Sequence, residues 1–262
     1  MRAYIAIAKK SAANQMAFRA DFWLGLLNTM IQIFVGASIW KALYGGQEII
    51  NGIPFNMVIT NIVLGLSVSN AQSVDDFALA GRVHSGGIAM NLLKPLSVNG
   101  ELLAHAVGAN LFRLLTRLIP SIGVSLLFFN VLPPVSATAL LLCVLACFMG
   151  FFVLYNLGYI ISALSFWFVN IWSFSTFKNV FVTVLSGTML PLWFMPGWMD
   201  GIIRFTPFDV LYFAPVQIYL GQLIGNDILA VFIKQGVWIA IFYAIGRVLW
   251  TNGIKKLVVA GG

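Results

Sequence analysis

Long apolar stretches without a single charged residue divide this chain. The longest runs from Leu118 to Phe177, and others follow Asp21, Glu48 and Lys178. A helix needs about 20 apolar residues to cross a hydrocarbon core that is roughly 30 Å thick. The longest stretch exceeds that length and two adjacent prolines interrupt it, so it must hold more than one crossing. The pattern predicts six membrane-spanning helices, over residues 22–42, 54–74, 112–130, 137–163, 176–195 and 228–250.

The composition agrees with a membrane protein and excludes several other classes. Of 262 residues, 60% are hydrophobic and 9% are charged, and the mean hydropathy is +0.94. A soluble domain has about 25% charged residues, so a soluble enzyme, a disordered regulator and a nucleic-acid-binding module are excluded. The net charge of +7 does not indicate a nucleic-acid partner, because the basic residues are scattered singly between apolar stretches. We expect an all-α integral membrane protein with a single transmembrane domain over residues 1–262.

The distribution of basic residues predicts the orientation. If the N-terminus is inside, the inner segments hold all but three of the 15 Lys and Arg residues, the exceptions being Lys41, Arg204 and Lys234. Acidic residues divide evenly between the two sides. Only the basic residues are biased, as the positive-inside rule requires. We expect a multi-pass protein of the cell membrane, taken to be a bacterial cytoplasmic membrane, with both termini cytoplasmic.

The segment before the first predicted span, residues 1–20, has the pattern of an interfacial helix. One face carries apolar side chains and the opposite face carries basic ones. Such a helix lies in the membrane surface with its basic side toward anionic head groups. The alternative is a frayed N-terminal tail. The apolar face comprises Tyr4, Ile7, Phe18 and Phe22, and the basic face comprises Arg2, Lys9 and Lys10.

The inner connection at residues 75–110 is the first segment that suggests a partner. Asp75 and Asp76 are placed to cap a short helix, since carboxylates favour helix N-termini. Gly81 and the Gly86-Gly87 pair should break that helix, and a second short turn should stop at Pro95. A short helix held between such breakers beside the membrane is a suitable contact for a soluble partner. The alternative is a solvated loop.

Candidates for metal binding and catalysis are few. Cys143 and Cys147 are four residues apart, but two thiols without further ligands do not make a metal site, so we expect them to pack in the membrane. Arg113 and Arg117 share a helical face on which like charges repel. We expect this pair at the head-group boundary, with contact to substrate as the alternative. No catalytic residue, metal site or cofactor site is predicted.

The outer connection at residues 196–227 is rich in proline and aromatic residues. Proline prevents one straight helix, so we expect two short helices that enter the membrane partway and return. Exposed backbone in lipid is costly, and such a segment should therefore pack against protein. It could close a pathway from outside, or it could be an aromatic belt at the interface. The candidate gate residues are Pro191, Trp193, Pro196, Trp198, Pro207 and Phe208.

Several short motifs, in this order and with this topology, resemble the six-span membrane subunits of type-2 ABC exporters. The resemblance covers the whole chain. The inner motifs are Gly81-Arg82-Val83-His84-Ser85-Gly86-Gly87-Ile88, Leu92-Leu93-Lys94-Pro95-Leu96 and Phe166-Trp167-Phe168. The outer ones are Ser186-Gly187, Pro191-Leu-Trp-Phe-Met-Pro-Gly-Trp198, Thr206-Pro207-Phe208 and Ile218-Tyr219-Leu220-Gly221.

The resemblance implies a division of labour between two polypeptides. The segment at residues 75–97 would be the coupling helix that docks on a separate ABC ATPase, and two permeases, identical or paralogous, would pair across spans one and five. ATP and Mg²⁺ would be bound by the ATPase alone, because this sequence has no Gly-x-x-x-x-Gly-Lys-Ser/Thr motif to hold phosphates. The implied coupling residues are Asp75, Asp76, Arg82, His84, Gly86, Gly87, Lys94 and Pro95.

The resulting hypothesis is that ATP hydrolysis drives alternating exposure of a path, along which an amphiphilic or drug-like substrate moves outward. Residues suited to a bulky apolar or cationic substrate are Met30, Phe34, Met57, Phe181 and Met189, although plain lipid contact would suit each of them as well. The alternatives are an ABC importer permease, a secondary carrier or channel, and a membrane-embedded enzyme. The importer motif is incomplete, and neither a charge at mid-membrane nor a catalytic motif supports the other two.

Overall fold

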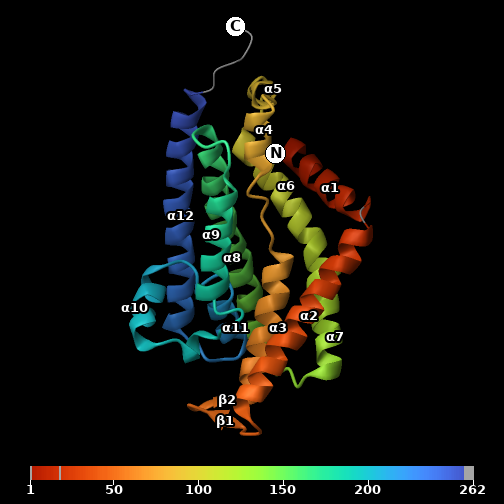
Figure 1. The fold of residues 1–262 in the computed structure, drawn as a ribbon, viewed down its shortest axis with the longest axis vertical. Helices are drawn as coiled ribbons and strands as arrows, with labels where there is room; N and C mark the ends of the chain where they lie inside the picture. The colour runs from red at the N-terminus through yellow and green to blue at the C-terminus, as the bar shows by residue number, and fades with distance from the viewer. Residues whose placement is uncertain (1, 18, 257–262) are drawn as a thin grey trace.

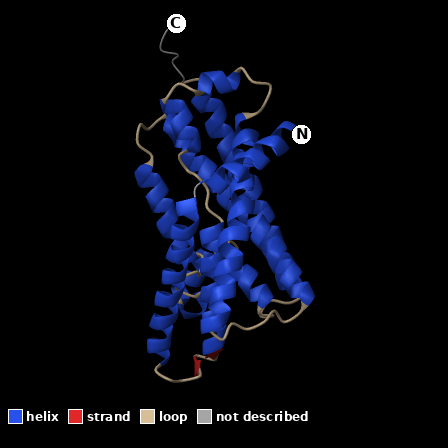
Figure 2. Ribbon diagram, turned by 90° about the vertical axis from the view of Figure 1, so that its right-hand side faces the viewer, coloured by secondary structure: helices blue, strands red, loops and turns tan. Residues whose placement is uncertain are grey.

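The chain forms an elongated helical bundle, with its two short strands at one end (Figure 1, Figure 2). The computed structural model describes residues 2–17 and 19–256. Strands β1 (Ile49–Ile50) and β2 (Ile53–Pro54) form an antiparallel hairpin. Helices α4 (Ala78–His84) and α5 (Ile88–Leu92) lie at the opposite end. We call the two ends the β end and the α4–α5 end.

Four of the described helices are long and apolar enough to cross a membrane. They are Ala20–Tyr44, Val98–Phe128, Ala137–Phe166 and Asn226–Ile254. In element terms these are α2 (Arg19–Tyr44), α6 (Val98–Arg113) with a π-helical turn (Leu114–Leu118) and α7 (Ile119–Phe128), α8 (Ala137–Ala163) with a 3-10 turn (Leu164–Phe166), and α12 (Asn226–Ile254). The remaining helices are α1 (Arg2–Ala17), α3 (Phe55–Ala71), α9 (Trp172–Leu185), a 3-10 turn (Leu192–Phe194), α10 (Gly197–Phe205) and α11 (Phe213–Tyr219). This architecture agrees with the predicted all-α membrane protein.

Local sequence explains several of these boundaries. Ser97 and Ser136 begin α6 and α8, where their hydroxyls accept hydrogen bonds from the backbone N–H groups three residues later. Pro120 cannot donate to the preceding turn, and the π-helical turn just before it lets the helix continue from α6 into α7. Gly187, with φ of 73°, ends α9, because this left-handed conformation favours glycine.

Three of the predicted span boundaries differ from the structure. The predicted start at residue 112 falls inside a continuous helix, so residues 98–110, assigned to the inner connection, form its first half. The predicted span 54–74 corresponds to a helix of 17 residues, and the predicted span 176–195 to one of 14 residues. In both of these the chain leaves the helix early, after Ala71 and after Leu185.

Helix α1 packs along α6 (Figure 1). Tyr4 exchanges hydrogen bonds with Ser97, and the Ser11 hydroxyl donates to the His105 carbonyl. A side chain at Gly108 would collide with the backbone carbonyl of Ala8, so the two helices are in close contact there. The face that was expected in lipid is therefore partly a protein contact, while Arg2, Lys9 and Lys10 on the other face are exposed as expected. Phe18 lies outside the described residues.

Candidate functional site

The chain between α3 and α4 is not helical, although it runs beside the long helices (Figure 1). We call residues 72–77 the connector. Non-helical backbone at membrane depth must find partners within the protein. The Ser73 carbonyl accepts hydrogen bonds from Asn110 Nδ2 at 3.2 Å and Arg113 Nη1 at 2.9 Å. Gln72 Nε2 donates to the Cys147 carbonyl at 2.8 Å. Polar side chains of α6 and the backbone of α8 therefore hold the connector in place.

A buried ion pair fixes the other end of the connector. Lys178 Nζ in α9 lies 2.7 Å from both carboxylate oxygens of Asp76, and the Ser175 hydroxyl donates to the same carboxylate at 2.5 Å. The side chains of Lys178 and Asp76 are only 5% and 4% exposed. Gly158 of α8 allows this approach, since a Cβ there would lie 2.8 Å from Asp76 Oδ1. We call this pair the latch.

The latch corrects the prediction for the two acidic residues. Neither carboxylate caps α4; the Ser162 hydroxyl of α8 accepts the hydrogen bonds of the Leu79 and Ala80 backbone N–H groups in its first turn instead. Asp75 is exposed and accepts a hydrogen bond from the Phe77 backbone N–H at 2.9 Å, whereas Asp76 is buried and unavailable to a partner. A buried carboxylate requires a counter-charge, and Lys178 supplies it. Gly81 also lies inside α4 and does not break it.

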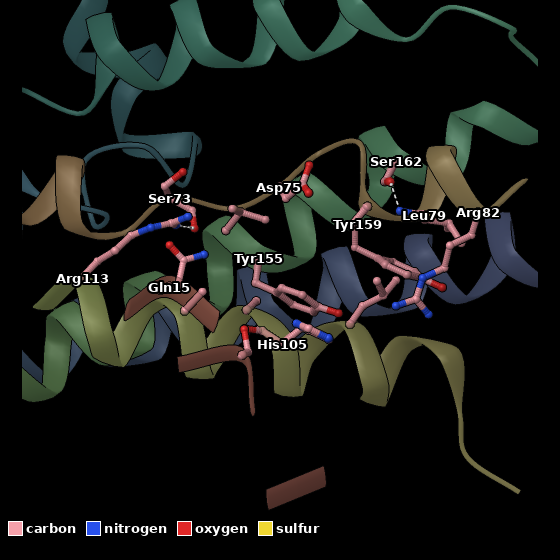
Figure 3. A pocket seen from close by; sticks show the side chains of 16 residues that line it. Gln15, Ser73, Asp75, Leu79, Arg82, His105, Arg113, Tyr155, Tyr159 and Ser162 are labelled. Atoms are coloured by element: carbon pink, nitrogen blue, oxygen red, sulfur yellow. Dashed lines mark hydrogen bonds between the residues drawn. The ribbon is translucent and has the colours of Figure 1, made fainter. Parts of the chain in front are cut away.

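A cavity of about 310 Å³ lies on the α1 and α6 side of the connector (Figure 3). We call it the inner cavity, because Ala78, Leu79 and Arg82 of α4 line it. Figure 3 shows Arg113 at one end of it, Arg82 at the other, and Asp75, Tyr155 and His105 between them. Arg82 also pairs with Glu101 at 3.1 Å. The inner cavity is therefore polar and carries both signs of charge.

A second cavity, of about 380 Å³, lies on the other side of the connector, among α2, α3, α8 and α9. We call it the central cavity. Gln32, halfway along α2, lines it and accepts a hydrogen bond from Asn70 at 3.0 Å. Ser73 and Val74 line both cavities. The connector is thus the wall between them, and the latch holds this wall against α9.

The α4–α5 end presents an exposed apolar tip. Around α5, the side chains of Met90, Leu92 and Leu93 are 67%, 46% and 80% exposed. Gly86, with φ of 71°, forms the turn between α4 and α5. Exposed apolar side chains gathered at one point are typical of a protein contact. Helix α4 joins the tip, residues 84–95, to the connector.

Comparison with protein families agrees with a protein of membrane helices. Residues 24–261 match the family model described as ABC-2 family transporter protein. The chain belongs to this family. Neither curated proteins nor solved structures gave a significant match. The resemblance drawn from the sequence motifs is therefore confirmed at the level of the family.

The predicted coupling residues of this ABC-2 protein fall into two groups. One group lies exposed at the tip, with Gly87 half-buried beside it, and comprises His84, Gly86, Lys94 and Pro95. The other group belongs to the connector and its surroundings: Asp75 and the half-buried Arg82 line the inner cavity, and Asp76 forms the latch. Of the predicted coupling residues, burial therefore excludes only Asp76 from a contact surface, and the coupling role of the others stays a prediction.

The predicted gate residues of the ABC-2 protein also differ in their burial. Trp193 packs against Phe213 with ring centroids 5.1 Å apart, and Phe208 packs against Phe181 at 6.2 Å. Pro191 and Pro207 are buried, whereas Pro196 is exposed and Trp198 on α10 is 71% exposed. Beneath this segment, Lys234 of α12 pairs with Asp209 at 2.7 Å. Burial raises the pKa of the Asp209 carboxyl, and Lys234 offsets only part of that rise.

None of the five predicted path residues lines the central cavity. Phe34 packs against Phe128 and Phe129, with ring centroids 5.3 and 5.1 Å apart. Phe181 and Met189 are 39% and 54% exposed on the outside of the bundle, and Met30 and Met57 are half-buried. These five side chains therefore do not line a common cavity with the connector, and their place on a substrate path stays a prediction.

Sequence reasoning missed the residues that hold the connector. Lys178 follows a long uncharged stretch and was used only to predict the orientation in the membrane, although a lysine beside apolar residues needs a carboxylate partner. That requirement was the available signal, with Asp76 as a candidate. Asn110, Gln72 and Ser175 carried no signal, because single polar residues are common in such helices. The described residues contain no group of His, Cys, Asp or Glu side chains that could hold a metal ion.

Proposed function

We propose that this chain is the permease subunit of an ATP-driven ABC exporter, with ATP hydrolysed by a separate subunit. The family match over residues 24–261 carries this proposal. The absence of a phosphate-binding motif from the sequence supports a second polypeptide as the ATPase. In this proposal six segments cross the membrane, the four long helices together with α3 and α9, and the α4–α5 end is cytoplasmic.

The tip is the docking point for the ATPase. Its apolar side chains would enter a groove on the ATPase, and Lys94 and His84 would lie at the rim, where exposed charges contribute to orientation more than to affinity. Because α4 joins the tip to the connector, a displacement of α4 would move Ser73 and Val74, the wall between the two cavities. The latch would carry the same displacement to α9.

Movement of this wall would give alternating access to the cavities. With the connector in its observed position, the inner and central cavities are separate spaces that share Ser73 and Val74 as lining residues. Movement of the connector would join the cavities and admit substrate from the α4–α5 end. Closure of the ATPase would then reset the wall and favour release toward the β end, past the outer segment. Each state needs its own stabilising contacts, and the latch supplies them for the closed wall.

A second permease copy would complete the site. The central cavity reaches the surface of α9 at Asn179 and Thr183, whose exposed side chains line it. Polar groups that face hydrocarbon without partners are costly. Pairing of two copies across α2 and α9 would cover this opening and would also cover exposed apolar side chains such as Leu27 and Phe177.

The docking assignment is tested by co-purification with the ATPase encoded beside this chain. Leu93→Asp should reduce recovery of the ATPase at least tenfold, because it places a charge in an apolar contact. The matched control is Ile224→Asp, since Ile224 is also an exposed loop residue, 70% exposed, near the start of α12. Normal recovery with Leu93→Asp would overturn the docking assignment. A solute-binding protein in the purified complex would favour import over export.

A further inference from the structure

Most of the side chains that line the central cavity are polar. The lining combines amide and hydroxyl side chains from α2, α3, α9 and the turn after α9 with a few apolar ones. The polar side chains are Gln32, Ser69, Asn70, Gln72, Ser73, Asn179, Thr183, Ser186, Thr188 and Tyr212, together with Lys178 and Arg117. A volume of about 380 Å³ is within the range of small-molecule sites.

The charged side chains that line the central cavity have one sign. Two cations line it, and no Asp or Glu is among the described lining residues. Asp76 lies within 2.7 Å of Lys178 and neutralises it. Arg117 has no carboxylate within ion-pair distance in the described part of the chain; its Nη2 donates to the Asp21 backbone carbonyl at 3.3 Å. The cavity lining therefore carries a positive charge at Arg117 that has no ion-pair partner among the described residues, and this charge repels cations at short range.

Hydrogen-bonding capacity in the central cavity is only partly used. Gln72 Oε1 is buried and has no partner among the described residues, while its Nε2 is bound to the Cys147 carbonyl. Neither Asn179 nor Thr183 has a side-chain hydrogen bond within the described ranges, and both line the opening. Hydroxyl and amide groups match both the unused donors and the unused acceptors, whereas an anionic oxygen matches the donors only.

We propose that the central cavity binds the oxygen-rich polar head group of an amphiphilic substrate, that this head group carries no positive charge, and that Arg117 determines the selection against cations. This inference rests on the proposed function, under which the cavity lies on the transport path. It replaces the expectation of a cationic substrate, since that expectation depended on aromatic and Met side chains that do not line the cavity. The apolar tail of the substrate would leave through the opening at α9.

The test measures protection of a cysteine in the cavity. Thr183→Cys is introduced into the full chain with Cys143→Ala and Cys147→Ala, and the protein is placed in lipid nanodiscs. Labelling by N-ethylmaleimide is followed with three probes that share one tail, namely octyl glucoside, octyl phosphate and octyltrimethylammonium, each below its micelle concentration. The neutral and anionic probes should slow labelling at concentrations at least about tenfold lower than the cationic probe, a factor typical of one favourable contact. Leu93→Cys at the tip is the control, and no probe should protect it.

Arg117 is tested in the same assay. Arg117→Gln should weaken protection by octyl phosphate and leave octyl glucoside nearly unchanged, whereas Arg117→Glu should make the cationic probe the strongest protector. Equal protection by all three probes would overturn the selection against cations, and an unchanged order in both Arg117 variants would overturn the role of Arg117. The assay needs neither nucleotide nor ATPase. Its failure therefore leaves ATPase docking untouched, and a failure of docking leaves the probe order to be measured independently.

Discussion

Removal of Lys178 alone should destabilise this protein much more than removal of the whole latch. Lys178→Met leaves Asp76, only 4% exposed, without its counter-charge. Breaking a buried ion pair by removing one partner costs about 3–5 kcal/mol. Ser175 keeps one hydrogen bond of 2.5 Å to the carboxylate, and such a bond to a charged group contributes about 1.5–3 kcal/mol. We therefore expect a loss near the lower limit, about 3 kcal/mol.

The double variant Asp76→Asn with Lys178→Met should recover most of that loss. Replacing both members of a buried pair by neutral groups of similar size is often neutral within about 1 kcal/mol. The single variant Asp76→Asn should be as unstable as Lys178→Met, because it leaves the ammonium group unpaired. The interaction free energy between the two positions, obtained from the four proteins, should therefore be several times the loss of the double variant.

Thermal unfolding measures these differences without an added reporter. Cys143 is buried and Cys147 is half-buried, so a maleimide dye should react with their thiols when the helices separate. A loss of about 3 kcal/mol should lower the midpoint by roughly 6–12 °C in a chain of this size. A Lys178→Met protein that unfolds at the same temperature as the unaltered chain would refute the reasoning. A double variant as unstable as either single one would refute it equally, since the charges would then not be the cause.

Two further predictions concern helix packing and pH. Gly108→Ala should release α1 from α6 and lower the free energy of unfolding by about 1–3 kcal/mol, because the added Cβ meets the Ala8 carbonyl. Gly123→Ala is the control in the same continuous helix. Its added Cβ has open space, so this variant should be stabilised by about 0.5–1 kcal/mol. Limited proteolysis after α1 should separate the two variants, and equal cleavage would contradict the α1–α6 contact. Because the pKa of Asp209 is raised in the folded state, the folded protein holds that proton more tightly than the unfolded chain, and this site gains stability as pH falls toward the raised pKa. Lys234→Met removes the group that limits the rise, so its unfolding midpoint should increase more between about pH 7 and pH 5 than that of the unaltered chain; an identical pH dependence would contradict the pairing.

The sequence predicted the long helices well because their signal is local. Uncharged stretches of sufficient length mark α2 and α8, a largely apolar stretch with Lys234 and Arg247 toward its ends marks α12, and the Gly86-Gly87 turn marked the boundary between α4 and α5. The start of the helix Val98–Phe128 was placed too late for a related reason. Its first half carries Glu101 and other polar residues, which suggest a loop in sequence, but that half packs against α1 and the connector in the structure.

The candidate site depended on contacts between distant residues, and these could not be predicted. Asp76 and Lys178 are separated by 102 positions, and a pair of adjacent acids before a short helix has the same local pattern whether it caps the helix or pairs elsewhere. The connector was concealed in a similar way, since residues 72–74 are as uncharged as the helix before them. Only the partners of Ser73 on α6 and of Gln72 on α8 show that the chain is extended there.

Reconstitution of this chain into liposomes, alone and together with its neighbouring ATPase, tests the central claim most directly. ATP hydrolysis and release of a fluorescent amphiphile with an uncharged head group are measured in both preparations. The account predicts that the chain alone neither hydrolyses ATP nor moves the amphiphile vectorially, and that the complex does both, with both activities lost in Leu93→Asp. Nucleotide hydrolysis or vectorial transport by the chain alone would contradict it.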